Sequence, residues 1–358
     1  MGLGHIAQAA VLPAFAHASR NSQLAALVSD DDVKLRKLGR KYGVRARYNY
    51  AQLDECLASG IDAVYIALPN HLHREYTERA ARAGVNVLCE KPLALTEKDC
   101  EAMIRAADKG GVKLMVAYRL HFEAANLSAL DAVESRTIGD PRIFNSVFTM
   151  QVQEGNVRLR REAGGGTLWD IGIYCINAAR NLFRDEPVEV FASTANNGEK
   201  RFREVDEMTT AVLRFPKERL ASFTCSFGAA DVSAYQVVGT KGDLRVDPAY
   251  EYKGELEQVI TVEGRTRERV FPKRDQFAPE LLHFSDCVLT GRDPQPGGRE
   301  GLADVRIIRA LHRSARTGRP VGLRPFTAPP RPTLAREKRR PPVRKRDLVH
   351  AKSASGDD

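Results

Sequence analysis

The chain has 358 residues, enough for two domains with full hydrophobic cores, and its 43% hydrophobic and 28% charged residues are ordinary for a soluble globular protein. It contains no apolar run of about 18 residues, so a membrane-spanning helix is not predicted. Of the formal net charge of +9, residues 327–358 contribute nine Lys or Arg minus four Asp or Glu, a net +5. The remaining +4 is spread over the rest of the chain, which argues against a nucleic-acid-binding domain.

The six cysteines are scattered and include no Cys-x-x-Cys pair. This spacing indicates neither a zinc site nor a disulfide framework, so no metal is expected. Scattered thiols suit a reducing compartment, and we expect a cytoplasmic location.

The N-terminal stretch Gly2-Leu3-Gly4-His5-Ile6-Ala7 has the form G-x-G-x-x-A, a dinucleotide-binding fingerprint. Gly2 would make a tight turn, Gly4 would let the backbone approach a pyrophosphate, and Ala7 would let helix and strand pack closely. The phosphates would lie at the helix N-terminus, whose N–H groups and dipole favour an anion. The fingerprint normally follows a strand, yet only Met1 precedes it. We therefore hypothesise that the natural start lies upstream and that Met1 occupies a position inside the first strand.

A buried strand is expected at residues 23–29, and it ends at Asp30. A second Rossmann strand meets the adenosine ribose at this point. Asp30 would accept a hydrogen bond from the ribose 2′-OH and favours NAD. Ser29 and Lys34 would hold a 2′-phosphate and favour NADP. The choice between the two cofactors therefore stays open.

Helical and strand patterns then alternate as far as residue 117. Predicted helices cover 34–42, 50–59, 73–83 and 96–109, and predicted strands cover 62–68, 85–89 and 113–117. This alternation predicts a parallel, doubly wound sheet.

The tripeptide Glu90-Lys91-Pro92 follows the strand predicted at 85–89 and precedes the helix predicted at 96–109. Lys91 is thus expected at the carboxyl end of a strand, where ligands bind in open α/β sheets. An ordinary surface turn explains the tripeptide alone equally well.

From residue 123 a helical stretch to about 135 is followed mainly by strands, which predicts an α+β domain with a mostly antiparallel, open sheet. Predicted strands cover 143–153, 188–194, 208–215, 220–227, 234–239, 242–246, 256–262 and 266–270, and predicted helices cover 277–290 and 301–317. We expect a dinucleotide-binding domain at 1–122, a substrate and oligomerisation domain at 123–326, and a disordered, basic, Pro-rich tail at 327–358.

A second group of candidate residues lies in 164–177, which begins with three glycines. Residues from Leu168 onward are expected to form a helix, on which Asp170 and Tyr174 share one face. A carboxylate and a phenol near a lysine suit proton transfer, because the ammonium of Lys91 would favour the phenolate while Asp170 orients a substrate hydroxyl. A buried helix with a satisfied Asp–Tyr pair is the alternative interpretation.

Five motifs occur in one order along the chain. They are Gly2-x-Gly4-x-x-Ala7, Pro69-Asn70-x-x-His73, Glu90-Lys91-Pro92, Tyr118-Arg119, and Gly164-Gly165-Gly166-x-Leu168-x-Asp170-x-Gly172-x-Tyr174. Over about residues 1–322 this order resembles the glucose–fructose oxidoreductase / inositol dehydrogenase (GFO/IDH/MocA) family. Tyr174 and Tyr118-Arg119 resemble its glucose–fructose oxidoreductase and dihydrodiol dehydrogenase branch.

The resemblance implies an N-terminal Rossmann domain, a C-terminal domain with an open sheet, and hydride transfer between a nicotinamide and a hydroxyl-bearing carbon, usually of a sugar. It implies that Lys91 binds cofactor and substrate, that Asp170 contacts substrate and that Tyr174 is the acid/base. The implied cofactor-binding residues are Gly2, Gly4, His5, Ile6, Ala7, Ser29, Asp30, Lys34, Leu68, Pro69, Asn70, His73, Glu90, Lys91 and Arg119. The implied substrate-binding residues are Lys91, Tyr118, Trp169, Asp170 and Tyr174.

We therefore expect an NAD(P)-dependent sugar oxidoreductase that forms a dimer or tetramer through its C-terminal sheet, with no nucleic-acid or membrane partner. The alternative is a regulatory protein on the same fold that binds nucleotide without turnover. The joint presence of Lys91, Asp170 and Tyr174 favours the enzyme.

Overall fold

The computed structural model describes residues 1–344 and 347–356 and divides into two compact units. Unit 1 comprises Met1–Arg119, Arg274–Leu302 and Arg339–Asp358, and unit 2 comprises Leu120–Lys273 and Ala303–Lys338. Both units are discontinuous, which differs from the continuous ranges expected from the sequence. The helix predicted at 277–290 belongs to unit 1 rather than to the second domain.

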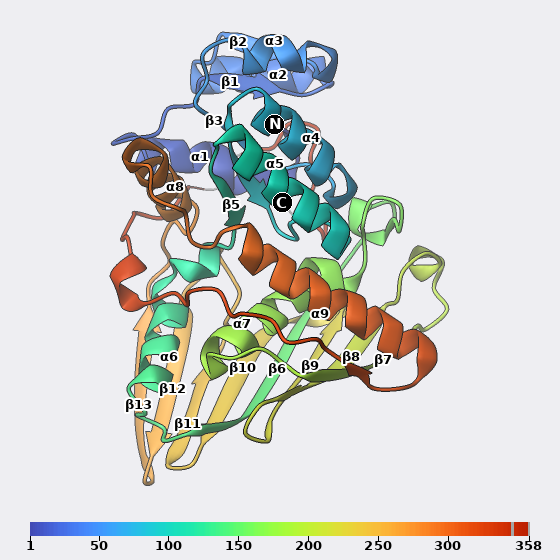
Figure 1. Ribbon diagram of the computed structural model, residues 1–358, viewed down its shortest axis with the longest axis vertical. Coiled ribbons are helices and arrows are strands. Elements are labelled where there is room, and N and C mark those ends of the chain that lie inside the picture. The colour runs from blue at the N-terminus through green and yellow to red at the C-terminus, as the bar shows by residue number, and fades with distance from the viewer. Residues whose placement is uncertain (345–346, 357–358) are drawn as a thin grey trace. The chain divides into compact units, whose positions relative to one another are not determined.

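Unit 1 alternates helices and strands as the sequence predicts (Figure 1). Its helical segments are η1 (Ala7–Val11), α1 (Leu12–Ala14), η2 (Phe15–His17), α2 (Asp32–Tyr42), η3 (Tyr50–Gln52), α3 (Leu53–Leu57), η4 (Asn70–Leu72), α4 (His73–Arg82), α5 (Glu97–Gly110) and α8 (Ala278–Thr290). Its strands are β1 (Ala26–Val28), β2 (Ala46–Tyr48), β3 (Ala63–Ile66), β4 (Asn86–Glu90) and β5 (Leu114–Ala117). All the pairings among these strands are parallel, which confirms the predicted fold class.

Capping residues mark the ends of two helices in unit 1. The Asp31 side chain accepts a hydrogen bond from the Lys34 amide and so caps α2, which ends at Gly43 with a φ of 69°. Thr96 caps α5 in the same way by accepting from the Asp99 amide. These caps place the carboxyl ends of the preceding strands beside helix N-termini, as a dinucleotide site needs.

The parallel sheet of unit 1 is in two parts, β1–β2 and β3–β4–β5, among the residues that the structure describes. Met1 and Gly2 lie between them: the Gly2 amide donates to Val28 O at 3.1 Å, and the Ala67 amide donates to Met1 O at 3.0 Å. A cavity of 610 Å³ is lined by β1, β3 and residues of α8. The two parts are thus joined near their carboxyl ends by the first two residues, at the place that the first Rossmann strand normally fills.

Unit 2 is built on a large sheet with helices α6 and α7 against one face, as Figure 1 shows. Its helical segments are α6 (Ala124–Glu134), η6 (Val157–Leu159), η7 (Leu168–Gly172), α7 (Ile173–Phe183), η8 (Lys200–Phe202) and η9 (Leu334–Arg336). Its strands are β6 (Pro141–Gln151), β7 (Glu189–Ala195), β8 (Met208–Phe215), β9 (Arg219–Ser226), β10 (Gly228–Gly239), β11 (Gly242–Val246), β12 (Leu256–Val262), β13 (Arg265–Phe271) and β14 (Val321–Gly322). Segments η5 (Arg119–His121) and α9 (Gly298–Thr317) each span the boundary between the units.

The strand order in this sheet is β13-β12-β11-β10-β6-β9-β8-β7-β14 within the described residues. The pairing of β6 with β9 is parallel and the other pairings are antiparallel, so the prediction of a mostly antiparallel sheet is confirmed. Large apolar side chains of this sheet, such as Phe144 and Phe223, are buried in the core of unit 2.

The tail expected to be disordered makes defined contacts where the structure describes it. Arg331 donates to Glu186 in unit 2. In unit 1 the main chain of Val349 forms two hydrogen bonds with the Gln8 side chain, and Val349 packs against a cluster that includes Leu3 and Leu12. Composition alone predicted a free tail because Pro and Arg bury little apolar surface, but Arg340 and His350 also contact unit 1, at His17 O and at the Asp31 carboxylate.

Candidate active site

The fingerprint segment has the geometry that its glycines predict. Gly2 has a φ of 80°, and a Cβ atom there would lie 2.3 Å from Ala67 O, so only glycine fits. No heavy atom lies within 4 Å of the position that a Gly4 Cβ would take. The helix that follows begins at His5, with Ile6 as the cap of η1. Open space beside a helix N-terminus fits a dinucleotide pyrophosphate.

The polar residues after β1 are fixed by local hydrogen bonds and an ion pair. Ser29 is buried, and its hydroxyl accepts from the Asp31 amide at 3.2 Å. The exposed Asp30 carboxylate accepts from the Tyr50 amide at 3.0 Å. The Lys34 ammonium lies 3.9 Å from the Asp31 carboxylate. The carboxylate of Asp30, which favours NAD, and the ammonium of Lys34, which favours NADP, both lie near the end of β1. The structure therefore does not decide between the two cofactors.

His73 ties two predicted cofactor-binding segments together. Its ring is fully buried, with Nε2 2.9 Å from Leu68 O and Nδ1 2.9 Å from Pro92 O. Burial lowers the pKa of this histidine. The segment after β3, which includes Pro69 and Asn70, is therefore held against the turn that carries Lys91.

The Glu90-Lys91-Pro92 turn follows β4, as predicted, and places Lys91 at the carboxyl end of a central strand. Glu90 accepts a hydrogen bond from the Tyr65 hydroxyl at 2.7 Å. Burial raises the pKa of Glu90, while the charge of Lys91 and the Tyr65 hydrogen bond oppose that shift. Glu90 therefore anchors the turn from inside the unit, and Lys91 is half-buried at its surface.

Arg119 has neighbours that the sequence did not reveal. Tyr118 and Arg119 are both buried, and Arg119 Nη1 donates to Gln276 Oε1. Glu280, in the first turn of α8, is fully buried, and its pKa is raised well above the ordinary value by burial, then by the charge of Glu90. Gln276 and Glu280 lie far from Arg119 in the chain, and no local pattern marks them.

In unit 2 the three glycines before η7 allow a close approach to another segment of the backbone. The Gly166 amide donates to Arg158 O and the Gly165 amide donates to Arg160 O, both at 2.9 Å. A Cβ atom at Gly165 would lie 2.3 Å from Arg158 O. Glycine is needed here so that this segment can lie against residues 158–160.

Asp170 lies in the π-helical segment η7 and Tyr174 in the first turn of α7. The predicted Asp170–Tyr174 face is therefore present on one continuous helical stretch, and both side chains are partly exposed. π-helical turns are rare and are frequent at functional sites. The Tyr174 ring contacts the rings of Phe148 and Tyr250, with centroids 5.6 and 5.9 Å away.

Asp170 has a partner that sequence reasoning missed. Arg158 Nε donates to Asp170 Oδ2 at 2.6 Å, and the two side chains are 29% and 20% exposed. Trp169, a predicted substrate-binding residue, is instead buried, and its ring lies against His312 with centroids 5.6 Å apart. In the sequence, Arg158 belongs to a basic run at Arg158–Arg161. Such a run is equally typical of a solvent-exposed loop, so it did not mark Arg158 as a site residue.

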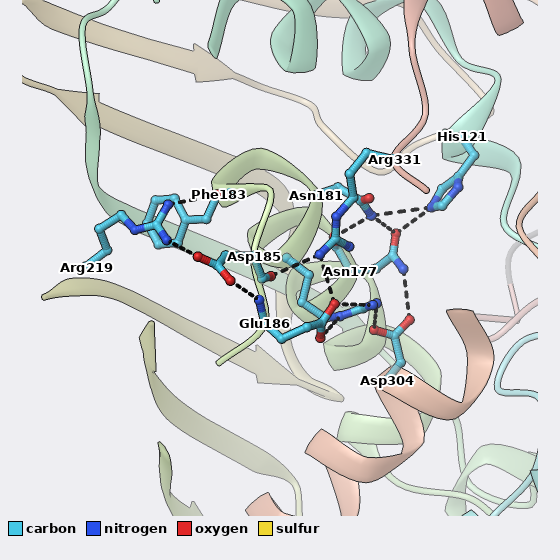
Figure 2. A network of polar contacts seen from close by, with 10 residues as sticks. His121, Asn177, Asn181, Phe183, Asp185, Glu186, Arg219, Asp304 and Arg331 are labelled. Carbon is cyan, nitrogen blue, oxygen red and sulfur yellow. Dashed lines mark hydrogen bonds and ion pairs between the residues drawn. The ribbon is translucent and has the colours of Figure 1, made fainter. Parts of the chain in front are cut away.

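A buried polar network fixes the far end of the helix that carries Tyr174 (Figure 2). Arg180 Nη1 donates to Asp304 at 2.6 Å, and its Nε and Nη2 bind Glu186 at 2.8 and 2.9 Å. Asn177 donates to the other oxygen of Asp304 at 2.8 Å, and its Oδ1 lies 2.8 Å from His121 Nε2. These contacts hold α7 to α9 and to the turn that follows α7, so Tyr174 sits on a fixed support.

The structure therefore assembles the predicted residues in two groups. Unit 1 brings together the fingerprint, the polar residues after β1, the 68–73 segment and the Lys91 turn. Unit 2 brings together Asp170 and Tyr174 and adds Arg158. Among the described residues no cluster of His, Cys, Asp and Glu has the arrangement of a metal site, and no helix has the length and hydropathy to cross a membrane.

Comparison with known proteins matches residues 1–118 to an oxidoreductase family with an NAD-binding Rossmann fold. Residues 127–245 match the GFO/IDH/MocA C-terminal domain. A D-xylose 1-dehydrogenase [NADP(+)] from Haloarcula marismortui is 34% identical over 74% of this chain and 75% of its own length. A 1,5-anhydro-D-fructose reductase from Ensifer adhaerens is 36% identical over 72% of this chain and 78% of its own length.

Two solved structures have the same fold over nearly their whole length. An aldose–aldose oxidoreductase from Caulobacter crescentus, complexed with glycerol, has a TM-score of 0.86 and 41% identity, and the match covers 90% of this chain and 98% of that one. A 3-ketoreductase from Actinomadura kijaniata, in complex with NADP and TDP-benzene, has a TM-score of 0.79 and 27% identity, covering 87% and 95%. Because the two family models together match more than half of the chain, and a relative that is 34% identical covers 74% of it, the chain belongs to the GFO/IDH/MocA family of oxidoreductases.

Proposed function

We propose that this protein is an NADP-dependent oxidoreductase that interconverts the hydroxyl and carbonyl forms of one carbon of an aldose. The proposal is supported by the position of Lys91 directly after β4 and by the position of Asp170 and Tyr174 on one continuous helical stretch, since the resemblance implies catalytic roles for these three residues. Relatives named for xylose and for aldoses support an aldose substrate, and a relative named for anhydrofructose supports sugars as the wider class.

The proposed roles follow from the chemistry of the side chains. The nicotinamide supplies hydride transfer when bound. Lys91 polarises the reacting oxygen with its positive charge. Tyr174 exchanges a proton with the same oxygen, as acid or base according to direction. Asp170 accepts a hydrogen bond from a substrate hydroxyl and so orients the sugar.

NADP is proposed as the cofactor rather than NAD. The buried Ser29 and the half-buried Lys34 flank the end of β1, where the 2′-phosphate would lie. Two relatives are named for NADP or contain it. Asp30 argues for NAD, because its exposed carboxylate can accept a ribose hydroxyl in addition to the Tyr50 amide, so the choice of NADP rests on Ser29, Lys34 and these relatives.

The test of this function is a comparison of Lys91→Met with Lys109→Met, a control at the end of α5. We expect the wild type and the control to bind NADPH more tightly than NADH and to turn over at least one neutral aldose. Lys91→Met should lose turnover by about 100-fold or more while melting at a similar temperature, because one charge aimed at the reacting oxygen is lost. Turnover by Lys91→Met at the rate of the control would refute the assignment.

We also propose that the protein forms homo-oligomers through the outer face of the unit 2 sheet. Ile143 on β6 pairs with Leu220 on β9, and Val212 on β8 pairs with Phe191 on β7. These four apolar side chains are 38–50% exposed and share one face of the sheet, together with Val147 at 40%. An apolar face of this kind suits a second copy.

Light scattering tests the assembly. The wild type should have the mass of a dimer or tetramer, and Leu220→Lys should lower it, because a charge would enter the interface. A monomeric wild type at micromolar concentration would contradict the assembly proposal.

A cytoplasmic location is also proposed, since all six cysteines are buried free thiols.

A further inference from the structure

Arg158 contacts the candidate catalytic helix in two separate ways. Its carbonyl oxygen accepts from the Gly166 amide at 2.9 Å, and its Nε donates to Asp170 Oδ2 at 2.6 Å. The Asp170 amide in turn donates to Gly166 O at 3.2 Å. One residue therefore fixes both the glycine segment that starts η7 and the carboxylate that η7 carries.

Arg158 is itself held in place. It lies in the short turn η6, whose cap Asn156 accepts from the Arg158 amide at 3.1 Å. The Asn156 side-chain oxygen also lies 3.5 Å from Arg158 Nη1. The guanidinium is thus oriented before any substrate arrives, which is what a positioning group requires.

The opposite charges of Arg158 and Asp170 bear on which ligands can bind beside them. The charge of Asp170 and its hydrogen bond raise the pKa of Arg158, while burial opposes this shift and Tyr252 and Tyr174 add smaller increases. Asp170 and Arg158 together carry no net charge. The carboxylate is 20% exposed, so a ligand hydroxyl can still reach it.

We propose that Arg158 is the positioning residue of this oxidoreductase site, and that its neutralisation of Asp170 makes the site select uncharged sugars over cationic amino sugars. The inference rests on the proposed function. Arg158 fixes the direction in which Asp170 receives a sugar hydroxyl, and it leaves no net negative charge to attract an ammonium group.

The experiment compares Arg158→Met with Arg160→Met. Arg160 is exposed two residues away, and only its main-chain carbonyl serves the glycine segment, so the control keeps that contact. Each variant is assayed for turnover of neutral aldoses and of the matching 2-amino-2-deoxy aldoses, at a pH where the amine is protonated. NADPH binding is measured separately by fluorescence.

Arg158→Met should lower kcat/KM for neutral aldoses by about 10–100-fold, as loss of a supporting contact does in other sites. The ratio of amino sugar to neutral sugar turnover should rise relative to wild type. The affinity for NADPH should stay unchanged. Added guanidinium should restore part of the turnover of Arg158→Met and none to Arg160→Met. In Asp170→Asn the further change Arg158→Met should have little effect, because the two side chains act as one unit.

Arg158→Lys keeps the positive charge but lacks the planar guanidinium. It replaces Arg158→Met in the experiment if that variant does not fold. It should lose neutral-sugar turnover without gaining amino-sugar preference. Equal kinetics in the Arg158 and Arg160 variants, or an unchanged sugar ratio in Arg158→Met, would overturn this inference and leave the proposed function standing. A wild type that binds NADPH but turns over no neutral aldose would instead overturn the proposed function, and this inference with it.

Discussion

The sheet of unit 2 runs without interruption from β13 to β14, whereas the parallel sheet of unit 1 is divided between β2–β1 and β3–β5 and is joined through Met1 and Gly2. The difference shows two ways of supporting a site. In unit 2 a continuous hydrogen-bonded sheet lies beneath the helix that carries Tyr174. In unit 1 the segments around the fingerprint depend more on individual buried polar contacts, such as those of Gln8, His73 and Glu90.

The largest expected effect on stability comes from the buried network of unit 2. Arg180→Met would leave Glu186 and Asp304 as buried carboxylates without their main partner. We expect the free energy of unfolding to fall by about 3–5 kcal/mol, because an uncompensated buried charge is costly. Arg214→Met is the matched control, since its pair with Glu218 is exposed to solvent and should contribute little to stability.

Urea titration of the two variants measures this difference. If Arg180→Met unfolds at the same urea concentration as Arg214→Met, the network does not support α7. The support of α7 would then come from its packing on the sheet alone.

The second prediction concerns Glu280 in unit 1. Because its pKa in the folded protein is raised well above the ordinary value of 4.5, the folded state keeps a proton that the unfolded state loses as pH rises. Its contribution therefore favours folding below about pH 4.5 and is lost progressively as pH rises toward the pKa of the folded protein. Glu280→Gln should remove this dependence and stabilise the protein near neutral pH by on the order of 1–3 kcal/mol.

Thermal melts of wild type and Glu280→Gln between about pH 5 and 8 test this linkage. The melting temperature of the wild type should fall more steeply with pH than that of the variant. The variant should keep a residual slope, because the raised pKa of Glu90 acts in the same direction. Parallel curves would show that Glu280 is not protonated in the folded state.

Most of the strand and helix order was predictable, because hydrophobic periodicity and capping residues are local signals. Thr96 and Gly43, for example, marked real helix ends. The short strand β2 was missed because three half-exposed residues carry no clear period. Arg158, Gln276 and Glu280 were missed because their roles depend on contacts made only in the folded chain.

The smallest expected effect concerns the tail. The buried Gln8 amide donates to Leu3 O and Val349 O, both at 2.8 Å, and its oxygen accepts from the Val349 amide at 2.7 Å. Gln8→Leu removes these hydrogen bonds, and the net loss should be about 0.5–1.5 kcal/mol, because the main chain of Val349 can hydrogen-bond to water once the tail is released. Trypsin should then cut the basic tail several-fold faster than in wild type or in Gln23→Leu, an exposed control. Equal cleavage rates would mean that Gln8 does not hold the tail.

The central claim is that Tyr174 exchanges the proton in a hydride-transfer reaction supported by NADP. Tyr174→Phe removes a single oxygen atom and keeps the ring that packs on Phe148 and Tyr250. Its rate of NADPH formation from NADP and a neutral aldose should be lower than that of wild type by about 100-fold to 10,000-fold, with NADPH binding unchanged. A Tyr174→Phe enzyme that turns over at the wild-type rate would contradict the account.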